Sequence, residues 1–147
     1  MPRVKRISRD MKRGMAARDK LLGKGWDKRP SVMQELFPEM HEMANEVLFG
    51  RLWSRTKGFP MRYRSMITIA TLIALGKTDE LRAHMKHGMH VGLTKQQVLE
   101  IILHEAFYAG WPAAVSALRI AKDVFAQVEA EAPAKPKRSR RAGRRRA

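Results

Sequence analysis

The chain of 147 residues contains no cysteine. This absence excludes disulfide bonds, a thiolate nucleophile and thiolate metal ligands. Long apolar runs are missing as well, since the longest mainly apolar stretch, residues 66–75, is too short to cross a bilayer. The N-terminus has no secretory signal, and Asp10 and Asp19 argue against an arginine-rich transit peptide. We therefore expect a cytoplasmic protein without a membrane anchor.

Acidic residues are scarce at both ends of the chain. Residues 1–29 hold eleven Lys/Arg and three Asp, residues 133–147 hold eight Lys/Arg and no acid, and residues 30–132 hold eleven of each sign. The net charge of +16 therefore belongs to the ends. We predict one domain over residues 1–131 and a basic disordered tail over residues 132–147, which would bind polyanions nonspecifically at low salt.

Apolar residues recur with helical spacing throughout the chain, and no strand pattern or internal repeat is evident. A short amphipathic helix is predicted over residues 11–22, and the sequence Gly-Lys-Gly at 23–25 ends it. Ser31 can cap the structure that follows. A longer amphipathic helix is predicted over residues 38–52, because its apolar residues stand at i, i+3, i+7 and i+8: Met40, Met43, Val47 and Leu48.

The most apolar helix is predicted over residues 60–75, and we expect it to be central and the most buried. Gly76 is suited to end this helix. Thr78 is suited to cap the next one, over residues 79–91, which Gly92 ends.

Two further helices are predicted in the C-terminal part of the domain. Thr94 and Gln97 have the spacing of a capping box at the start of the first one, and Gly110 ends it. Pro112 suits the first turn of the last helix, which extends to about residue 128. The sequence therefore predicts an all-α domain of about six helices with short connections.

Several short motifs carry a family resemblance. Three lie in the helical core: Arg-Tyr-Arg-Ser at 62–65, Glu-Leu-Arg-Ala-His at 80–84, and Tyr-Ala-Gly-Trp-Pro at 108–112. Others precede the core: Arg13-Gly14-Met15 with Arg18, Leu22-Gly23, and Trp53-Ser54-Arg55. Together they resemble the carboxymuconolactone decarboxylase family over about residues 12–127. The match beyond the core points to the decarboxylase branch of the family.

The resemblance implies a fold, an assembly and a reaction. Members of this family are all-α and assemble as ring-like homo-oligomers, typically hexamers built from trimers or dimers. The decarboxylases convert γ-carboxymuconolactone to β-ketoadipate enol-lactone in the protocatechuate branch of aromatic catabolism. They need no metal or organic cofactor, so the expected partners are a small lactone carboxylate and further copies of the chain.

The redox-active branch of the family carries a Cys-x-x-Cys motif that three residues separate from a histidine. His84 and Gly92 keep the spacing of that histidine and its following glycine, but Lys77 and Glu80 occupy the cysteine positions. Peroxide reduction by thiols is therefore blocked, although such chains are often labelled peroxiredoxin-like. Decarboxylase-like members carry a glutamate four residues before the histidine, as this chain does.

The resemblance and the chemistry together indicate His84 and Glu80 as catalytic residues. The reaction needs a proton delivered to carbon, and imidazole can exchange a proton near neutral pH. Glu80 lies one helical turn earlier on the same face and can orient the imidazole or stabilise its protonated form. Without the family match, an ordinary surface Glu–His pair would be the simpler interpretation.

Substrate binding is assigned to Arg62, Arg64, Tyr108 and Trp111. Arginine pairs bidentately with carboxylates, and the two arginines stand at the start of an apolar helix. On sequence alone a solvated loop or an inter-subunit ion pair explains them equally well. Tyr108 can donate its hydroxyl to an oxyanion or fill the core, and Trp111 is bulkier than the usual residue at its position.

The remaining polar candidates carry weaker signals. His84, His87 and His90 invite a metal hypothesis, but steps of three residues rotate His90 away from His84, and we expect His87 and His90 on a solvated face. Glu100 and Glu105 diverge by about 140° on a helix and do not form a carboxylate pair. His104 is interpreted as a packed or interface residue.

Alternative functions remain open at this point. A paralogue with the same fold could act on another lactone or β-keto acid, as the bulk of Trp111 suggests. A protein of a different class, a polyanion-binding non-enzyme, would act through the basic tail.

Overall fold

The computed structural model describes residues 7–28 and 30–132, and these residues form helices and no strand. The predicted tail from residue 133 onward lies outside them. In the described part, no helix has the length and apolarity needed to cross a bilayer. The elements are α1 (Arg9–Leu22), η1 (Trp26–Lys28), α2 (Val32–Leu36), α3 (Pro38–Met43), η2 (Ala44–Trp53), α4 (Met61–Ala74), α5 (Thr78–His90), α6 (Lys95–Tyr108) and α7 (Trp111–Glu131).

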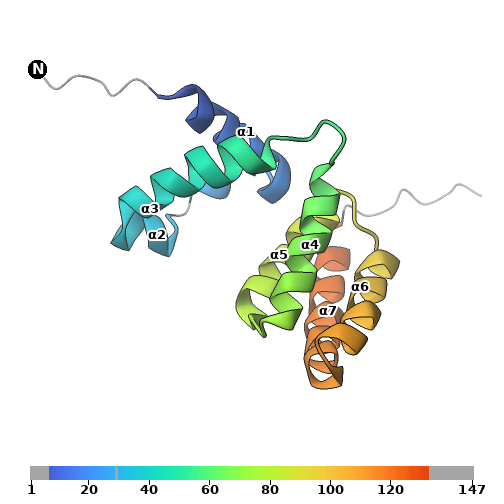
Figure 1. Cartoon of the computed structure of the whole chain (residues 1–147). Helices are drawn as coiled ribbons and strands as arrows, with labels where there is room; N and C mark the ends of the chain where they lie inside the picture. Colours follow the sequence, from blue (N-terminus) through green and yellow to red (C-terminus); the bar gives the residue numbers. More distant parts are fainter. Residues whose placement is uncertain (1–6, 29, 133–147) are drawn as a thin grey trace, which may run out of the picture.

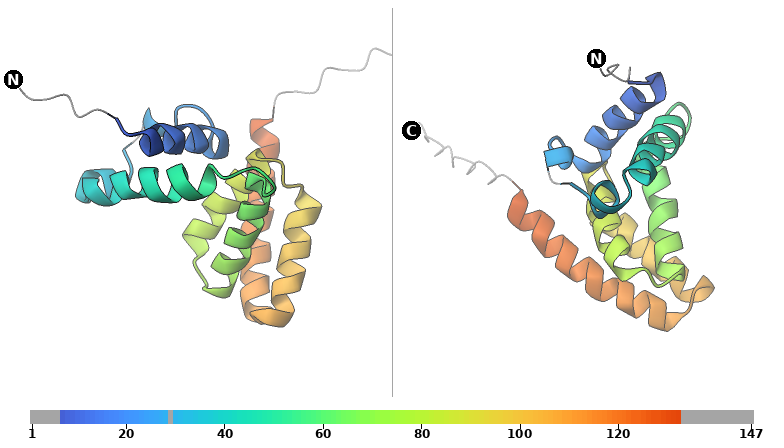
Figure 2. Two further views of the ribbon diagram at one scale, coloured as in Figure 1. Left: turned by 45° about the horizontal axis from the view of Figure 1, so that its top comes forward. Right: turned by 90° about the vertical axis from the view of Figure 1, so that its left-hand side faces the viewer.

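The helices form two layers at a large angle to one another. Helices α4 to α7 make an antiparallel four-helix bundle, in which α4 and α7 each pack against both α5 and α6 (Figure 1). Helices α1, α3 and η2 lie across one end of this bundle and extend away from it, with α2 at the far end (Figure 2). α1 packs along η2 and also contacts α5.

Each layer has its own apolar core. The bundle core contains side chains from all four helices, including Ile69, Met85, Ile102 and Val124, each at most 2% exposed. The second core joins α1 to the end of η2 and the start of α4, through Ala17, Leu21, Trp53 and Met61. This second core is what anchors α1 to the bundle.

α1 and η2 cross so closely that only glycine fits at the contact. A Cβ atom on Gly14 would lie 1.9 Å from the backbone oxygen of Asn45, and one on Gly50 would lie 2.3 Å from the backbone oxygen of Asp10. η2 is a π-helix, in which hydrogen bonds join residues five apart. That register brings Asn45 and Gly50 to the same side of η2, facing α1.

Several predicted helix ends are confirmed by their hydrogen bonds. Thr94 and Gln97 form the capping box at the start of α6. At the end of α4 the N–H of Gly76 donates to Ile73 O (3.1 Å) and that of Lys77 donates to Leu72 O (3.0 Å). Gly76 has φ 64°, as this helix stop requires. Pro112 stands in the first turn of α7, as predicted.

Other predictions about the helices are wrong. Thr78 is the first helical residue of α5 and Lys77 occupies the cap position without a side-chain bond. The predicted helix over residues 38–52 is confirmed in its range, since residues 38–53 are helical throughout, but it changes from α3 to the π-helix η2. Apolar spacing does not reveal such a change of hydrogen-bond register. The apolar side chains of this helix are exposed in the single chain: Met40, Met43, Val47 and Leu48.

α4 is not the most buried helix either. Its buried residues are Met61, Ser65, Ile69 and Ile73, whereas Ile67 is 57% exposed. α4 lies at the edge of the bundle, so α5 and α6 cover one of its faces and leave the other open. The high apolar content of α4 therefore exceeds what one chain buries.

Replacing Gly14 with alanine tests the close crossing of α1 and η2. Helix propensity alone predicts that Gly14→Ala stabilises the protein by about 1 kcal/mol. We expect the opposite, a loss of about 2 kcal/mol or more, because the new Cβ meets backbone atoms that cannot move aside. Thermal unfolding should show a Tm lower by about 5–10 °C. Met15→Ala, at the neighbouring exposed position, is the control, and a raised Tm for Gly14→Ala would contradict the crossing.

Candidate functional site

Five side-chain polar atoms are buried without a hydrogen-bond partner among the described residues. They are Arg18 Nε, Arg64 Nε, Ser65 Oγ, His84 Nδ1 and His87 Nδ1. All five belong to α1, α4 and α5; α1 contacts α5 and, through the second apolar core, the start of α4, and α4 contacts α5. We call these five residues on the three contacting helices the three-helix junction. Buried polar atoms are normally paired because leaving one unpaired is costly. Their concentration here marks the junction as the candidate site for a polar ligand.

His84 lies half-buried on α5. Burial lowers the pKa of His84 below its usual value, and the negative charge of Glu80 opposes that shift. Glu80 itself is exposed, and the structure describes no hydrogen bond between the two side chains. Glu80 therefore acts on His84 through its charge across one helical turn, as the spacing predicted.

His87 is a functional candidate that the sequence reasoning missed. Its ring lies 5.8 Å from that of His84, centroid to centroid, at an angle of 77°. Burial and, in decreasing order, the charges of His84, Lys86, His90 and Arg18 together lower the pKa of His87 to about 4. The prediction of a solvated face is wrong for His87 because α1 packs against this part of α5; His90 is exposed as predicted.

Arg18 is the second residue that the sequence reasoning did not assign to the site. It is only 7% exposed, and its Nη1 donates to Asn45 Oδ1 at 2.7 Å. Its Cζ lies 4.0 Å from the ring centroid of Trp26 and 4.8 Å from that of Phe49. A signal was present, since Arg18 follows Gly14 by four residues on the buried face of α1, where an arginine is out of place.

The two arginines of α4 point in different directions. Arg64 is half-buried, donates from Nη2 to the backbone oxygen of Arg55 (3.0 Å) and lies over the ring of Phe59. Arg62 is exposed and lies against the ring of Tyr63. Residues two apart on a helix face different sides, so within one chain only Arg64 belongs to the junction.

Tyr108 and Trp111 lie at the opposite end of the bundle from the arginines. Trp111 begins α7, whose first turn borders the turn between α4 and α5, whereas Arg62 and Arg64 stand at the start of α4, about 20 Å away along that helix. Tyr108 is 78% exposed and stacks on His104, and Trp111 is 61% exposed. A single chain therefore does not bring these two residues together with Arg62 and Arg64.

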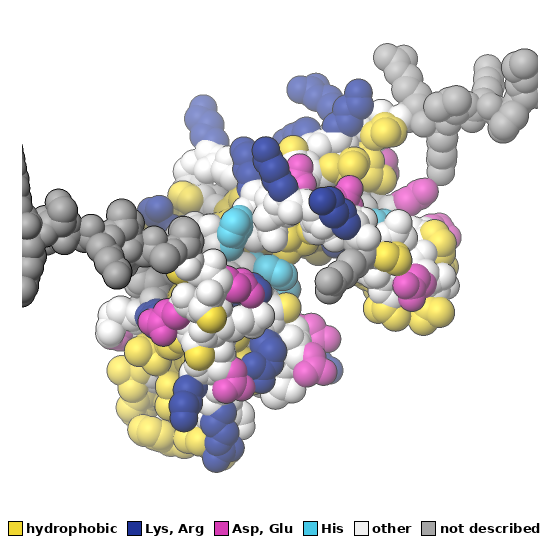
Figure 3. Space-filling model, turned by 180° about the vertical axis from the view of Figure 1, so that it is seen from behind, with side chains coloured by type: hydrophobic (Ala, Val, Ile, Leu, Met, Phe, Trp, Pro, Cys, Tyr) yellow, Lys and Arg dark blue, Asp and Glu magenta, His cyan; other side chains and the backbone are white. Residues whose placement is uncertain are grey.

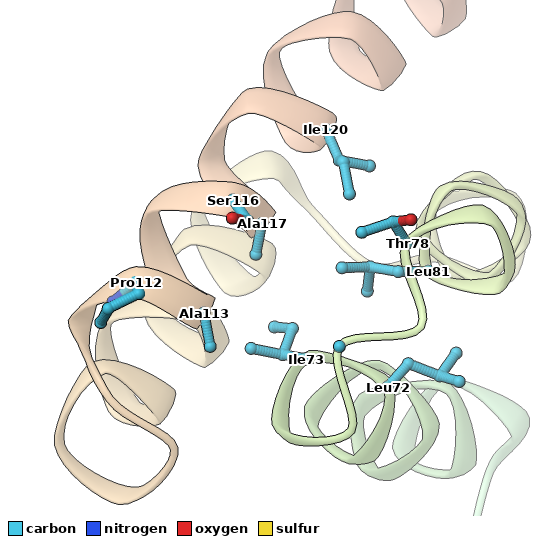
Figure 4. A pocket seen from close by; sticks show the side chains of 10 residues that line it. Leu72, Ile73, Thr78, Leu81, Pro112, Ala113, Ser116, Ala117 and Ile120 are labelled. Carbon is cyan, nitrogen blue, oxygen red and sulfur yellow. The ribbon is translucent and has the colours of Figure 1, made fainter.

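A cavity of about 270 Å³ lies between α4, α5 and α7 near these two residues (Figure 4). Its lining is almost entirely apolar, and the only hydroxyl groups in it belong to Thr78 and Ser116. A cavity with no charged group suits an apolar ligand better than an anion. It is therefore not the place where a carboxylate would bind.

The junction differs from that cavity in its electrostatics. Histidine side chains lie where the N-terminal layer meets the bundle, and Lys and Arg gather over that layer (Figure 3). Three helices bring cationic or proton-exchanging groups together here, namely Arg18, Arg64, His84 and His87. Among the described residues no group of three or more His, Asp or Glu side chains is arranged to hold a metal ion. A guanidinium can pair with an anion and an imidazole can exchange a proton, and the junction contains both kinds of group.

Comparison with known proteins agrees with this chemistry. Residues 38–123 match the carboxymuconolactone decarboxylase family. A 4-carboxymuconolactone decarboxylase of Acinetobacter baylyi is 36% identical over 115 residues, which cover 78% of this chain and 85% of the relative.

Two further relatives are more distant. An uncharacterised 15.0 kDa protein of Paracoccus denitrificans is 30% identical over 68% of this chain and 75% of its own. A nitrosuccinic acid decarboxylase of Metarhizium robertsii is 30% identical over 77 residues, 52% of this chain and 53% of its own. The relatives with assigned activities are carboxy-lyases, and this chain is one as well. The resemblance seen in the sequence is thus confirmed, and the chain belongs to the carboxymuconolactone decarboxylase family.

Proposed function

We propose that this protein decarboxylates 4-carboxymuconolactone, also called γ-carboxymuconolactone, to β-ketoadipate enol-lactone. The observation that carries the proposal is the three-helix junction, where the half-buried His84 lies beside His87 and where Arg18 and Arg64 each have a buried Nε without a partner among the described residues. The named relative from Acinetobacter baylyi supports the choice of substrate. The place of this reaction in aromatic catabolism is part of the proposal.

The reaction sets three demands. The substrate carries two carboxylates; the bond to one of them breaks, CO₂ leaves, and the electron pair delocalises through the ring to the lactone carbonyl as a dienolate. One proton must then reach a ring carbon, so the dianionic substrate and one proton give CO₂ and a monoanionic product. The site must bind anions, stabilise the dienolate oxygen and supply that proton.

The residues of the junction are suited to these tasks. His84 delivers the proton and is recharged from solvent, while the charge of Glu80 favours its protonated form. The dianionic substrate raises the pKa of His84 further once it is bound, which loads the proton where it is needed. Arg64 supplies a partly desolvated guanidinium for an anionic group of the substrate.

The other predicted binding residues require a second copy of the chain. Arg62, Tyr108 and Trp111 are exposed in one chain. Trp111 lines a groove of about 310 Å³ between α6 and α7. The same faces expose large apolar side chains, including Phe107 (74%) and Leu103 (53%). Faces of this kind are typical of subunit interfaces, so we propose a homo-oligomer, a trimer or hexamer, in which Tyr108 and Trp111 complete the site of a neighbouring copy.

A related substrate is the second candidate. The relative from Metarhizium robertsii acts, by its name, on nitrosuccinic acid, so a substrate other than the lactone is compatible with the family. The indole of Trp111 would restrict the space for a substrate if it closes the site. A panel of lactones and β-keto acids separates the two candidates.

Removing residues 133–147 tests the tail: retained turnover with lost nucleic-acid binding would assign the tail to nonspecific adhesion.

Replacing His84 tests its role as the proton donor. His84→Ala should lower kcat for γ-carboxymuconolactone by about 100-fold to 10,000-fold, because proton transfer from a positioned group contributes about that much. A spectrophotometric assay of enol-lactone formation measures the rate, and sedimentation checks that the assembly is unchanged. His90→Ala, an exposed histidine on the same helix, is the matched control. Wild-type turnover by His84→Ala would rule out this assignment.

The pH dependence of kcat/KM tests the electrostatic link between Glu80 and His84. The protonated imidazole is the active form, and burial places its pKa below the ordinary value of about 6.5, so kcat/KM should fall as the pH rises through that lowered pKa. Glu80→Gln removes the charge that raises this pKa, so the fall should move to lower pH. Asp79→Asn, in the same turn of α5, should leave the profile in place. A midpoint that stays or moves upward in Glu80→Gln would disprove the link.

A further inference from the structure

We propose that Arg18 binds the carboxylate that the substrate keeps, so that the enzyme selects dicarboxylic substrates through a residue of its N-terminal helix. The inference rests on the proposed decarboxylation and extends it. Arg18 lies outside residues 38–123, which match the family model, and although it stands in an N-terminal motif of the resemblance, the sequence assigned it no role in the site. The argument depends on its burial, its free hydrogen-bonding edge and the chemistry of carboxylate loss.

The guanidinium of Arg18 is buried without a counter-charge. Asn45 accepts from its Nη1 but is neutral, and no carboxylate forms an ion pair with it among the described residues. The nearest acid in sequence, Asp19, accepts instead from the indole N–H of Trp26 at 2.9 Å. An uncompensated buried cation is costly, and a bound carboxylate would relieve that cost.

One hydrogen-bonding edge of the Arg18 guanidinium has no partner among the described residues. Aromatic rings of Trp26 and Phe49 contact the guanidinium, and Nη1 is engaged by Asn45, which together fix its position. Nε remains buried and unpaired, and it belongs to the edge with which arginine binds a carboxylate bidentately. The guanidinium is therefore held in place before any anion arrives.

Arg18 acts electrostatically on His87, and His87 is the neighbour of the proposed catalytic residue His84. It lowers the pKa of His87 on α5 and of His41 on α3, and the ring of His87 in turn lies 5.8 Å from that of His84. An anion at Arg18 thus lies beside the neutral His87 and on the same side of α5 as the proposed proton donor. In the proposed complex one carboxylate of the substrate lies at Arg18 and the reacting carbon lies at His84.

Chemistry decides which carboxylate Arg18 should hold. The leaving carboxylate loses its charge in the transition state, so a cation paired with it would stabilise the ground state more and slow the reaction. The retained carboxylate keeps its charge throughout, and binding it strongly costs nothing in the chemical step. The most buried cation of the junction is therefore suited to the retained carboxylate.

The test is the binding of succinate, a stable dicarboxylate, to the full-length protein. Isothermal titration measures its affinity, and the indole N–H signal of Trp26 in NMR spectra reports where it binds, because this ring contacts Arg18. We expect succinate to shift the Trp26 signal and succinamide, its neutral isostere, to leave it unchanged. Absence of any shift with succinate in the wild-type protein would overturn the proposal without requiring a variant to fold.

Two variants separate a binding role from a structural one. Asn45→Asp keeps the shape and the 2.7 Å contact but gives Arg18 an internal carboxylate, so it should preserve the fold while weakening succinate binding by about tenfold or more. Arg18→Lys loses the bidentate edge and should weaken binding similarly. Arg13→Gln, which removes an exposed arginine from the same helix, is the control. Unchanged succinate affinity in Asn45→Asp would mean that Arg18 only supports the fold.

The succinate test and the turnover assay can fail separately. Binding of succinate at Arg18 without turnover of γ-carboxymuconolactone would retain the dicarboxylate site and reject the proposed substrate. Turnover of γ-carboxymuconolactone with no effect of Asn45→Asp on its kcat/KM would retain the reaction and reject the role of Arg18.

Discussion

The close crossing of α1 on η2 is the constraint on which the rest of the site depends. Gly14 and Gly50 let two backbones approach to a distance that no side chain would allow. Only in this position does α1 direct Arg18 between Asn45 and α5. The second apolar core then fixes α1 against the start of α4, so a packing contact far from the proton chemistry determines where the buried charge lies.

The junction buries one charged guanidinium, that of Arg18, beside imidazoles that burial keeps neutral. Arg18 is buried and no acid among the described residues pairs with it. Burial also keeps His84 and His87 in their neutral forms near physiological pH, as their lowered pKa values indicate. Because the histidines do not add further positive charge, the junction tolerates one buried cation. An arriving anion reverses both effects, since it pairs with the guanidinium and favours protonation of the imidazoles.

Much of the bundle could be predicted from the sequence because its ends are encoded locally. Gly76 has the positive φ of a helix stop, Thr94 caps the start of α6 with its side chain, and Pro112 stands in the first turn of α7. Each of the three stands where the sequence predicted it. The π-helix could not be predicted, since its register depends on contact with α1 rather than on the spacing of its own apolar residues. Thr78 shows a similar limit. A residue with a capping side chain acts as a cap only where the backbone is not yet helical, and here Thr78 is already the first residue of α5.

The site was predicted less completely than the fold. His84, Glu80 and Arg64 were chosen from motifs and helix geometry, and in the structure Arg64 and His84 each have a buried nitrogen without a partner among the described residues. Arg18 was not recognised because it stands among the basic residues of the N-terminus, whose charge suggests exposure to solvent. His87 was not recognised because α1, the helix that packs against this part of α5, lies far away in the sequence. Tyr108 and Trp111 belong to the opposite end of the bundle, and their meaning depends on contacts between chains, which one chain does not contain.

The π-register of η2 has a consequence for how this sequence can change in length. Ten residues, 44–53, bridge the two glycine contacts and the Asn45 bond in a helix that is wider than an α-helix. Deleting a single residue there would favour the ordinary register, turn Asn45 away from Gly50 and release Arg18 from its partner. Loops such as residues 54–60 tolerate insertions and deletions more readily. The length of residues 44–53 should therefore vary less among homologous sequences that keep the function than the side chains of these residues do.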